Sequence, residues 1–373
     1  MSIIVNIGIF GLNILYFFMK CLPVQNKITY ISRQMDVTPL DFQMIIDETK
    51  KINPDIQHVV LAKMLKKGMK NHILYCFHML KQMYHIATSK MVILDTYCIP
   101  VCILKQRSDL VVIQIWHALG AFKKFGYSIL DQPEGSSSKI AHLMRMHKNY
   151  TYVFSSSEYT RPFFADAFHV DLSQVKVFPL PKTDLLVDEN HKQVISQNIL
   201  ETYPQLCQSD KKIIVYAPTF RKDDHVLYNA IKELIDVIDF NQYHLVLKLH
   251  PLTTFHIHDS RIIEDHQYTS LEFFHVANYI ITDYSAVIFE ASLLNKPLFF
   301  YAFDYEEYMR KRSMYIDYIH DLPGTIFQSP KSLIESLNHP QRYDIQSFAH
   351  KMIAKPQTTY TQDIVRFMME QWK

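Results

Sequence analysis

The chain has 373 residues, of which 48% are hydrophobic, and its 39 Lys and Arg nearly balance its 37 Asp and Glu. This length suffices for two domains with sizeable cores, and the lack of a concentrated basic face argues against a nucleic-acid-binding protein. The five cysteines are scattered and odd in number, and Cys98 with Cys102 lacks the second pair of a zinc site. They predict reduced thiols in the cytoplasm.

The chain begins with an apolar stretch, residues 3–19. It is near the lower limit for crossing a bilayer, contains Asn6 and Asn13, and lacks the basic region and cleavage site of a secretory signal. We therefore expect residues 1–24 to form a helix that lies on a membrane. A helix buried against the fold is the alternative.

Strands and helices alternate through the rest of the chain. This alternation predicts doubly wound α/β domains with parallel sheets. Pro179 and Pro181 interrupt regular structure and indicate the connection between an N-terminal domain, residues 25–180, and a C-terminal domain, residues 181–373. The expected strands include residues 27–32, 91–94, 111–115, 150–154, 212–216, 244–248 and 279–281, and the last expected helix covers residues 360–372.

Polar side chains follow four of these apolar strands. In open parallel sheets, ligands bind beyond the carboxyl ends of strands, so the clusters predict one convergent site. The polar residues in question are His117, Thr219, Arg221, His250, Asp283 and Ser285. A single His at a strand end is more often structural than catalytic, but the repetition favours function.

The stretch from Tyr279 to Leu294 reads as strand, tight turn and helix. Backbone N–H groups in the first turn of a helix lack partners, so Ser285 as N-cap would help to hold a phosphate. An ordinary capped helix is the alternative, and the neighbouring clusters favour the phosphate.

The ordered motifs resemble those of the teichoic-acid glycerophosphotransferase family, which uses CDP-glycerol. The resemblance extends from about residue 28 to the C-terminus. It departs from the family where Ala118-Leu119-Gly120 replaces Gly-Thr-Pro and where the chain reads Pro181-Lys182-Thr183-Asp184, and both departures bear on the acceptor. The motifs are Trp116-His117, Lys123-Lys124, Tyr216 to Arg221, Lys248-Leu249-His250-Pro251, Thr282 to Glu290, Pro297 to Tyr301 with Asp304 and Tyr308, and Leu322-Pro323-Gly324.

The resemblance implies a GT-B-like architecture, in which two Rossmann-type domains face a cleft. The N-terminal domain would bind the acceptor and the C-terminal domain the CDP donor, and the last helix would cross back to the N-terminal domain. The acceptor would be an undecaprenyl-diphosphate-linked disaccharide, a precursor of wall teichoic acid. The protein would be a peripheral protein at the cytoplasmic face of a Gram-positive cell membrane. It could form a homo-oligomer.

In this reaction an acceptor hydroxyl attacks the alditol-bearing phosphorus and CMP leaves, so a base and groups that balance phosphate charge are needed. The resemblance places the base at His117. His250, Thr219, Arg221 and Ser285 would hold the diphosphate, with Arg221 forking onto two oxygens. Asp283 would fix the turn by bonding backbone amides. Glu290 would reach ribose hydroxyls or be a plain surface residue, and the acceptor side would include Trp116, Lys123 and Lys124.

We expect neither a cofactor nor an essential metal. Asp223 and Asp224 are the best candidates for carboxylates that bind a metal ion, but such pairs are usually solvated. A primase that adds one glycerol phosphate is expected, because the chain shows one catalytic unit and a changed turn beside the base. The alternatives are a CDP-glycerol or CDP-ribitol polymerase, a nucleotide-sugar glycosyltransferase, and a non-catalytic scaffold of wall-polymer assembly.

Overall fold

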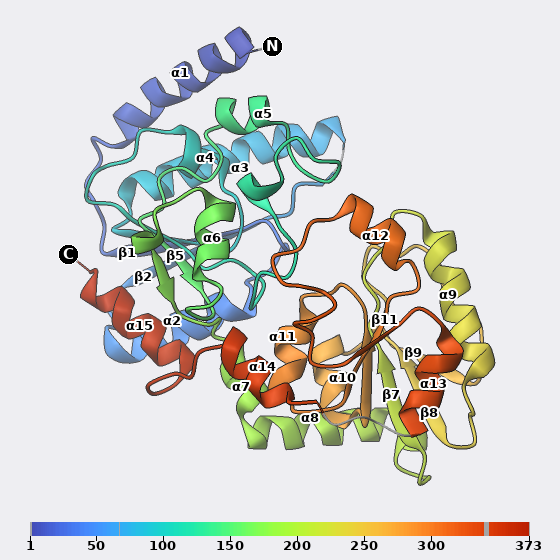
Figure 1. The fold of residues 1–373 in the computed structure, drawn as a ribbon. Coiled ribbons are helices and arrows are strands. Elements are labelled where there is room, and N and C mark those ends of the chain that lie inside the picture. The colour runs from blue at the N-terminus through green and yellow to red at the C-terminus, as the bar shows by residue number, and fades with distance from the viewer. Residues whose placement is uncertain (1, 67, 339–342, 373) are drawn as a thin grey trace. The chain divides into compact units, whose positions relative to one another are not determined.

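The structure is a computed structural model that describes residues 2–66, 68–338 and 343–372 (Figure 1). The chain divides into two compact units. Unit 1 consists of Met1–Leu119, Lys124–Asp184 and Ala354–Lys373, and unit 2 of Gly120–Lys123 and Leu185–Ile353. The chain passes to unit 2 after Asp184, whereas the sequence places the connection after residue 180. Gly120–Lys123 belongs to unit 2 and not to the expected N-terminal domain, and Ala354–Lys373, which contains the last helix, returns to unit 1.

Unit 1 contains a six-stranded, entirely parallel sheet in the order β2-β1-β3-β4-β5-β6. Its strands β1 and β3 are buried at every position, as expected for apolar runs covered on both faces. The strands are β1 (Lys27–Ser32), β2 (Gln57–Ala62), β3 (Met91–Leu94), β4 (Val111–Gln114), β5 (Tyr152–Ser155) and β6 (Val175–Val177). The helices are α1 (Ser2–Met19), α2 (Leu40–Ile52), α3 (Met69–Thr88), α4 (Ile99–Ile103), η1 (Gly126–Ile129), α5 (Ser138–Leu143), α6 (Arg161–Phe168), η2 (Leu172–Gln174), α7 (Thr183–Val187, which runs into unit 2) and α15 (Tyr360–Glu370).

Unit 2 contains a second parallel sheet in the order β12-β11-β10-β7-β8-β9. Apolar side chains of β7, β8, β10 and β11 form a core with α9 and α13, while α10 packs with α8 and α11, and α11 packs with α14. The strands are β7 (Lys212–Tyr216), β8 (Tyr243–Leu247), β9 (Ile262–Glu264), β10 (Tyr279–Thr282), β11 (Leu298–Tyr301) and β12 (Thr325–Phe327). The helices are α8 (Glu189–Thr202), η3 (Pro204–Leu206), α9 (Asp224–Val237), α10 (Ser270–Val276), α11 (Val287–Leu293), α12 (Tyr305–Lys311), α13 (Pro330–Asn338) and α14 (Ile345–Met352).

Each sheet has a point at which the strand order reverses. In unit 1 it lies between β1 and β3, and in unit 2 between β7 and β10. Loops diverge there at the carboxyl ends of the strands and leave room for a ligand. The strand ends singled out in the sequence therefore lie where doubly wound sheets bind ligands.

Helix α15 belongs to unit 1, where it packs against α2. The carboxylate of Asp184 accepts hydrogen bonds from the backbone N–H groups of Tyr360 (2.7 Å) and Thr361 (2.9 Å), at the start of the helix. These contacts satisfy amides that have no partner within the helix. Asp184 therefore ties the end of the chain to unit 1.

Helix α1 is long and apolar enough to cross a membrane, judged by length and composition alone. One side of it contacts unit 1, because Ile9 and Tyr16 are buried and the Tyr16 hydroxyl donates to Gln106 Oε1 at 2.6 Å. Most of its other apolar side chains are exposed, including Ile4 (76%) and Phe10 (68%), so the alternative of a buried helix is wrong. The helix lies at the periphery of unit 1 (Figure 1).

All five cysteines lie within the described ranges, and all are free thiols, as predicted. Cys98 and Cys102 are buried, and burial raises the pKa of the Cys98 thiol to about 12. A thiol with so high a pKa is a poor nucleophile and metal ligand.

Candidate active site

His117 follows strand β4 and lies on the wall of a pocket in unit 1. The pocket has a volume of about 330 Å³. Since β1 and β3 flank the reversal of strand order, the pocket occupies the usual ligand position of a doubly wound sheet. Its lining comes from the segments after β1, β2, β3 and β4, namely Arg33, Gln34, Met64, Leu65, Thr96, Tyr97, Trp116 and His117.

The backbone of Trp116 adopts a left-handed conformation, with φ of 63°. For a side chain this bulky, the conformation costs about 1–3 kcal/mol and persists only where the surroundings enforce it. Here the indole stacks on Phe125, with ring centroids 4.7 Å apart, and its backbone N–H donates to Gln114 Oε1 at 3.0 Å. The ring of His117 lies 4.1 Å from the indole, centroid to centroid. Trp116 thus positions His117 as well as lining the pocket.

A hydrogen bond to Asp95 fixes the tautomer of His117. Nδ1 of His117 lies 3.0 Å from the backbone carbonyl oxygen of Asp95. A carbonyl oxygen only accepts, so Nδ1 carries the proton, and Nε2 of the neutral ring presents a lone pair. His117 is therefore arranged as a proton acceptor at Nε2.

The surroundings of His117 also keep the ring neutral. Part of the side chain is exposed, but the surrounding protein atoms desolvate the ring, and this desolvation lowers its pKa. The bond to Asp95 raises the pKa by a smaller amount, and the charge of Lys182 lowers it further. Lowering the pKa of a histidine below its ordinary value increases the unprotonated fraction at neutral pH.

Asp95, which sequence analysis did not single out, lies directly after strand β3 with its side chain buried. Burial raises the pKa of this carboxyl to about 6, although hydrogen bonds from Ser32 and Thr96 act in the opposite direction. Its Oδ1 is buried and makes no hydrogen bond within the described part of the chain. The signal available in the sequence was an acidic residue directly after the apolar strand of residues 91–94.

In unit 2, the guanidinium of Arg221 lies between two carboxylates. Nε and Nη2 donate to Asp304 at 2.7 and 3.1 Å, and Nη2 also donates to Asp283 Oδ2 at 2.9 Å. Nη1 donates to the carbonyl of Thr219 at 2.7 Å. The guanidinium also lies over the ring of Tyr308, at 4.9 Å from the centroid. Arg221 is buried, and each of its three nitrogens has a protein acceptor.

This arrangement corrects the role expected for Arg221. The sequence predicted that Arg221 would fork onto two phosphate oxygens, but the fork is made with the carboxylate of Asp304. Buried carboxylates left without this cation would be costly. Arg221 is therefore a positioning residue that joins the segments after β7, β10 and β11.

Asp283 fixes the turn after β10, as predicted. Its Oδ1 accepts from the backbone N–H groups of Tyr284 (2.7 Å) and Thr219 (2.8 Å), which links the two strands at the reversal of strand order. Ser285 Oγ accepts from the N–H of Val287 at 3.3 Å, at the start of α11. Thr219 Oγ1 is buried and makes no hydrogen bond with any described residue.

Glu290 lies within α11 and is 5% exposed. The alternative of an ordinary surface glutamate is therefore wrong. A contact between Glu290 and a ribose stays a prediction.

His250 follows strand β8 and has the opposite tautomer from His117. The backbone N–H of Leu252 donates to Nδ1 of His250 at 3.1 Å, so Nδ1 holds the lone pair and Nε2 of the neutral ring carries the proton. Partial burial lowers its pKa, and the charge of Lys123 lowers it further. His250 can thus donate a hydrogen bond from Nε2 without carrying a charge.

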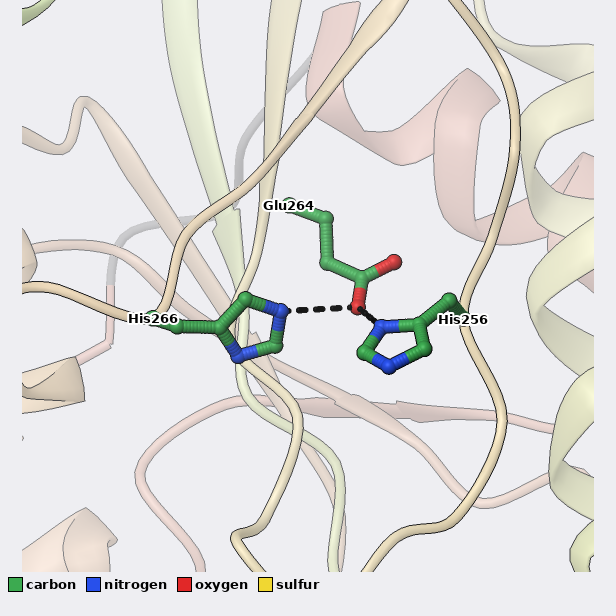
Figure 2. Close-up of side chains that lie close together, drawn as sticks. All are labelled: His256, Glu264 and His266. Atoms are coloured by element: carbon green, nitrogen blue, oxygen red, sulfur yellow. Dashed lines mark hydrogen bonds and ion pairs between the residues drawn. The ribbon is translucent and has the colours of Figure 1, made fainter.

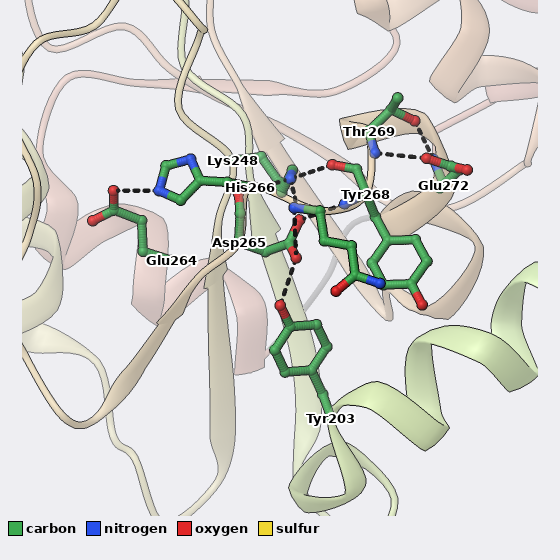
Figure 3. Close-up of polar contacts among 9 residues, drawn as sticks. Tyr203, Lys248, Glu264, Asp265, His266, Tyr268, Thr269 and Glu272 are labelled. Carbon is green, nitrogen blue, oxygen red and sulfur yellow. Dashed lines mark hydrogen bonds and ion pairs between the residues drawn. The ribbon is translucent and has the colours of Figure 1, made fainter.

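The segment that carries His250 is anchored by Lys248 (Figure 3). Buried Nζ of Lys248 donates to the carboxylate of Asp265, to its backbone oxygen at 2.9 Å, and to the carbonyl of Tyr268. Asp265 also accepts from the Tyr203 hydroxyl at 2.5 Å. Three acceptors at one ammonium group compensate for its burial. The Lys248 of the motif is therefore structural.

Lys123 belongs to unit 2 and not to the acceptor side of the N-terminal domain as expected. Its backbone forms an isolated antiparallel β-bridge with Met314, and its Nζ lies 5.5 Å from the ring centroid of Tyr308. Gly120, the first residue of the segment that contains Lys123, is closely packed, since an added Cβ would come within 2.6 Å of Phe289 Cε2. Lys124 begins the segment that returns to unit 1. The altered Ala118-Leu119-Gly120 turn therefore needs glycine at its last position.

Comparison with known proteins agrees with the motifs. Residues 14–369 match the CDP-Glycerol:Poly(glycerophosphate) glycerophosphotransferase family. The chain belongs to this family. The family predicted from the order of the motifs is confirmed, and the protein is an enzyme.

Two relatives of this glycerophosphotransferase show how far the similarity extends. Teichoic acid ribitol-phosphate primase of Bacillus spizizenii is 32% identical over 345 residues, which cover 89% of this chain and 88% of the relative. Teichoic acid glycerol-phosphate primase of Bacillus subtilis is 29% identical over 306 residues, covering 78% of this chain and 76% of the relative.

Solved structures support the fold of the glycerophosphotransferase. The wall teichoic acid polymerase TagF superposes with a TM-score of 0.71 at 21% identity, over 99% of this chain and 97% of that chain. UDP-GlcNAc 2-epimerase from Methanocaldococcus jannaschii gives a TM-score of 0.59 at 13% identity, over 92% and 99%. The predicted GT-B-like class, with two parallel-sheet domains, is confirmed.

Proposed function

We propose that this glycerophosphotransferase moves an alditol phosphate from a CDP-alditol to a hydroxyl of a lipid-linked wall teichoic acid precursor and releases CMP. The observation that carries the proposal is the opposite tautomers of two histidines. The bond at Nδ1 leaves Nε2 of His117 with a lone pair that can accept a hydrogen bond, whereas the bond at Nδ1 of His250 leaves its Nε2 with a proton that it can donate. A phosphoryl transfer needs one group of each kind.

The proposed reaction begins with the removal of a proton from the acceptor hydroxyl by Nε2 of His117. The hydroxyl oxygen forms a bond to the phosphorus that carries the alditol, and the bond from this phosphorus to the bridging oxygen breaks. CMP leaves with the electrons of that bond. The resulting histidinium of His117 returns its proton to solvent.

Unit 2 would bind the diphosphate without a fork from arginine. Nε2 of His250 can donate to a phosphate oxygen, and the hydroxyl of Thr219, which has no described partner, is available to donate as well. Arg221 and Asp283 would hold the Thr219 backbone in place. Ser285 and Glu290 keep their proposed contacts with phosphate and ribose.

We propose a primase role with glycerol phosphate as the unit added. Support comes from two primases among the relatives that are matched over more than three quarters of their length. A second candidate donor is CDP-ribitol, because the relative at 32% identity is a ribitol-phosphate primase.

Proximity to a membrane would serve such a lipid-linked acceptor. The exposed apolar side chains of α1 support peripheral attachment through this helix. Holding enzyme and lipid at one surface raises their effective concentration. We propose the cytoplasmic face, where a nucleotide-linked donor would be available.

A donor screen tests the proposal. The full chain is incubated with a synthetic disaccharide-diphosphate lipid and CDP-glycerol, CDP-ribitol or a UDP-sugar, and CMP release and product mass are measured. One added glycerol phosphate is the expected product, and one added ribitol phosphate would support the second candidate. A ladder of units would contradict the primase role alone. Transfer only from UDP-sugars, or no transfer at all, would overturn the proposed reaction.

A further inference from the structure

Two histidines and a glutamate converge at the edge of the unit 2 sheet (Figure 2). Oε1 of Glu264 lies 2.7 Å from Nδ1 of His256 and 3.0 Å from Nε2 of His266. The three atoms all lie within 4.8 Å of one another. None of these residues has a role in the proposed reaction.

The glutamate is held in place while the histidines are open to solvent. Glu264 ends strand β9, the edge strand, and its side chain is 11% exposed, against 61% for His256 and 60% for His266. Its second oxygen, Oε2, accepts from the backbone N–H of Ile257 at 2.7 Å. This bond fixes the carboxylate so that Oε1 points toward both rings, as an outer contact does for a metal ligand. The open side leaves room for a further ligand.

We propose that His256 Nδ1, Glu264 Oε1 and His266 Nε2 bind one Zn²⁺ ion. Bonds of about 2.0–2.1 Å in a tetrahedral site place neighbouring ligand atoms about 3.3 Å apart. The present separations of 2.7 and 3.0 Å from Glu264 Oε1 would lengthen by a few tenths of an ångström, and the two ring nitrogens, which lie within 4.8 Å of each other, would take up the same spacing by rotation of the exposed rings. Each ring would shift its proton to the nitrogen that faces solvent, which frees a lone pair for the ion.

The donor set selects the class of cation. Two imidazole nitrogens and one carboxylate oxygen suit Zn²⁺ and neighbouring transition metals, whereas Mg²⁺ and Ca²⁺ require mainly oxygen ligands. Two histidines and one glutamate leave a fourth position for water. The site would thus take Zn²⁺, or Co²⁺ in its place, in preference to Mg²⁺.

Bound metal would tie the middle of the segment between β8 and β9 to the end of strand β9. His256 lies within this segment, while Glu264 and His266 flank Asp265, whose carboxylate anchors Lys248 (Figure 3). The segment is also attached through Asp224, which accepts from the backbone N–H of Thr254 at 3.1 Å, and through Ile257, which is buried in the core of unit 2. A metal ion would therefore restrain the polypeptide from residue 249 to residue 261.

Metal titration of the untagged full chain tests the proposal. Calorimetry with ZnCl₂ and absorption spectroscopy with CoCl₂ measure stoichiometry, affinity and coordination. One ion per chain is expected, with the visible bands of four-coordinate Co²⁺, and Mg²⁺ at the same concentration should not compete. Stoichiometry far from one, or equal competition by Mg²⁺, would overturn the proposal.

Single variants separate this site from the other 17 of the chain's 19 histidines. His256→Ala and His266→Ala should each weaken Zn²⁺ binding at least about tenfold, as loss of a ligand requires. His258→Ala is the matched control, because His258 is an exposed histidine of the same segment, and it should bind as the unchanged chain does. Unchanged affinity in both ligand variants, or equal loss in the control, would show that Zn²⁺ binds elsewhere. Circular dichroism of each variant checks that it is folded.

Hydrogen exchange gives a readout that does not depend on catalysis. Amides of residues 249–261 should exchange more slowly with Zn²⁺ in the unchanged chain and in His258→Ala, but not in His256→Ala. Protection that persists in His256→Ala would contradict the proposed coordination.

Discussion

His117 donates the proton on Nδ1 to the backbone carbonyl oxygen of Asp95 at 3.0 Å. Because this bond leaves Nε2 as an acceptor, His117→Ala should lower kcat at least about a hundredfold, the usual minimum for a positioned general base. The dissociation constant of the CDP-alditol should change little. His320→Ala, at an exposed histidine bonded to Asp317, is the matched control and should keep full turnover. Collapse of donor affinity with turnover preserved would make His117 a donor ligand.

The pH profile provides the second part of this test. The pKa of His117 is lowered from its usual 6.5, chiefly by desolvation. The neutral ring is the active form, so kcat/KM should rise with pH to a plateau, with the midpoint below pH 6.5. The residual activity of His117→Ala should lack this acidic limb. A limb of unchanged midpoint in the variant would assign the titration to a different group.

Asp95→Asn should stabilise the protein at neutral and alkaline pH. Burial raises the pKa of Asp95 from 3.8 to about 6, so the folded state binds the proton more tightly than the unfolded state, and stability falls as pH rises from about 4 to 6. Asparagine removes this cost, which is about 1–3 kcal/mol above pH 7. Urea unfolding at pH 4 and pH 8 measures it, and the gain should vanish at pH 4. Asp210→Asn, at an exposed position, is the control. A gain that is equal at both pH values would exclude titration of Asp95 as its cause.

His250→Ala should weaken binding of the CDP-alditol or of the transition state. Because the backbone N–H of Leu252 donates to Nδ1, Nε2 is the hydrogen-bond donor of His250. Loss of one positioned donor costs about 2.7–4 kcal/mol of transition-state stabilisation. The expected result is a fall of about a hundredfold or more in kcat/KM. His258→Ala again serves as the control, since it changes an exposed histidine in the same segment. Normal kinetics in His250→Ala would remove this histidine from the reaction.

The sequence predicts the central strands well, because each is an apolar run bounded by turn signals. Strands β1, β3 and β7 begin and end at the predicted residues. Thr219, Arg221 and Asp283 follow the strands that flank the reversal point of unit 2, and His117 and His250 each follow a strand next to a reversal point. Short edge strands such as β9, with only partly buried side chains, give no comparable signal.

The partners of the site residues are not predictable in the same way. Asp304, which accepts hydrogen bonds from Arg221, lies 83 residues further along the chain. The sequence pattern does not show that the guanidinium binds this carboxylate and not a phosphate. The tautomer of His117 depends on a carbonyl 22 residues away. Lys123 lies in unit 2 beside Tyr308 and Met314, which are far from it along the chain. These are tertiary contacts, which local pattern does not encode.

Arg221→Ala should destabilise unit 2 by about 3–5 kcal/mol, because it leaves Asp283 and Asp304 without their shared cation. The free energy of unfolding, from urea denaturation, measures this effect. Arg261→Ala is the matched control, because Arg261 forms an exposed pair with Asp259 and such pairs contribute at most about 1 kcal/mol. A stable Arg221→Ala protein with a raised KM for the donor would instead restore the phosphate fork expected from the sequence.

The exposed face of α1 should determine membrane attachment. Phe10 and Phe17 are 68% and 60% exposed, whereas Ile9 and Tyr16 hold the helix to unit 1. Replacing both phenylalanines by aspartate should leave that contact intact and remove two side chains that would each gain about 1.5–3 kcal/mol on burial in lipid. Co-sedimentation with anionic vesicles should then weaken more than a hundredfold, while activity on a short soluble acceptor is kept. Val194→Asp, at a 56% exposed position in α8, makes the same kind of change away from the helix and should sediment as the unchanged chain does. If the double variant still binds vesicles as tightly as the control, α1 is not the attachment site, and its apolar face must have another partner.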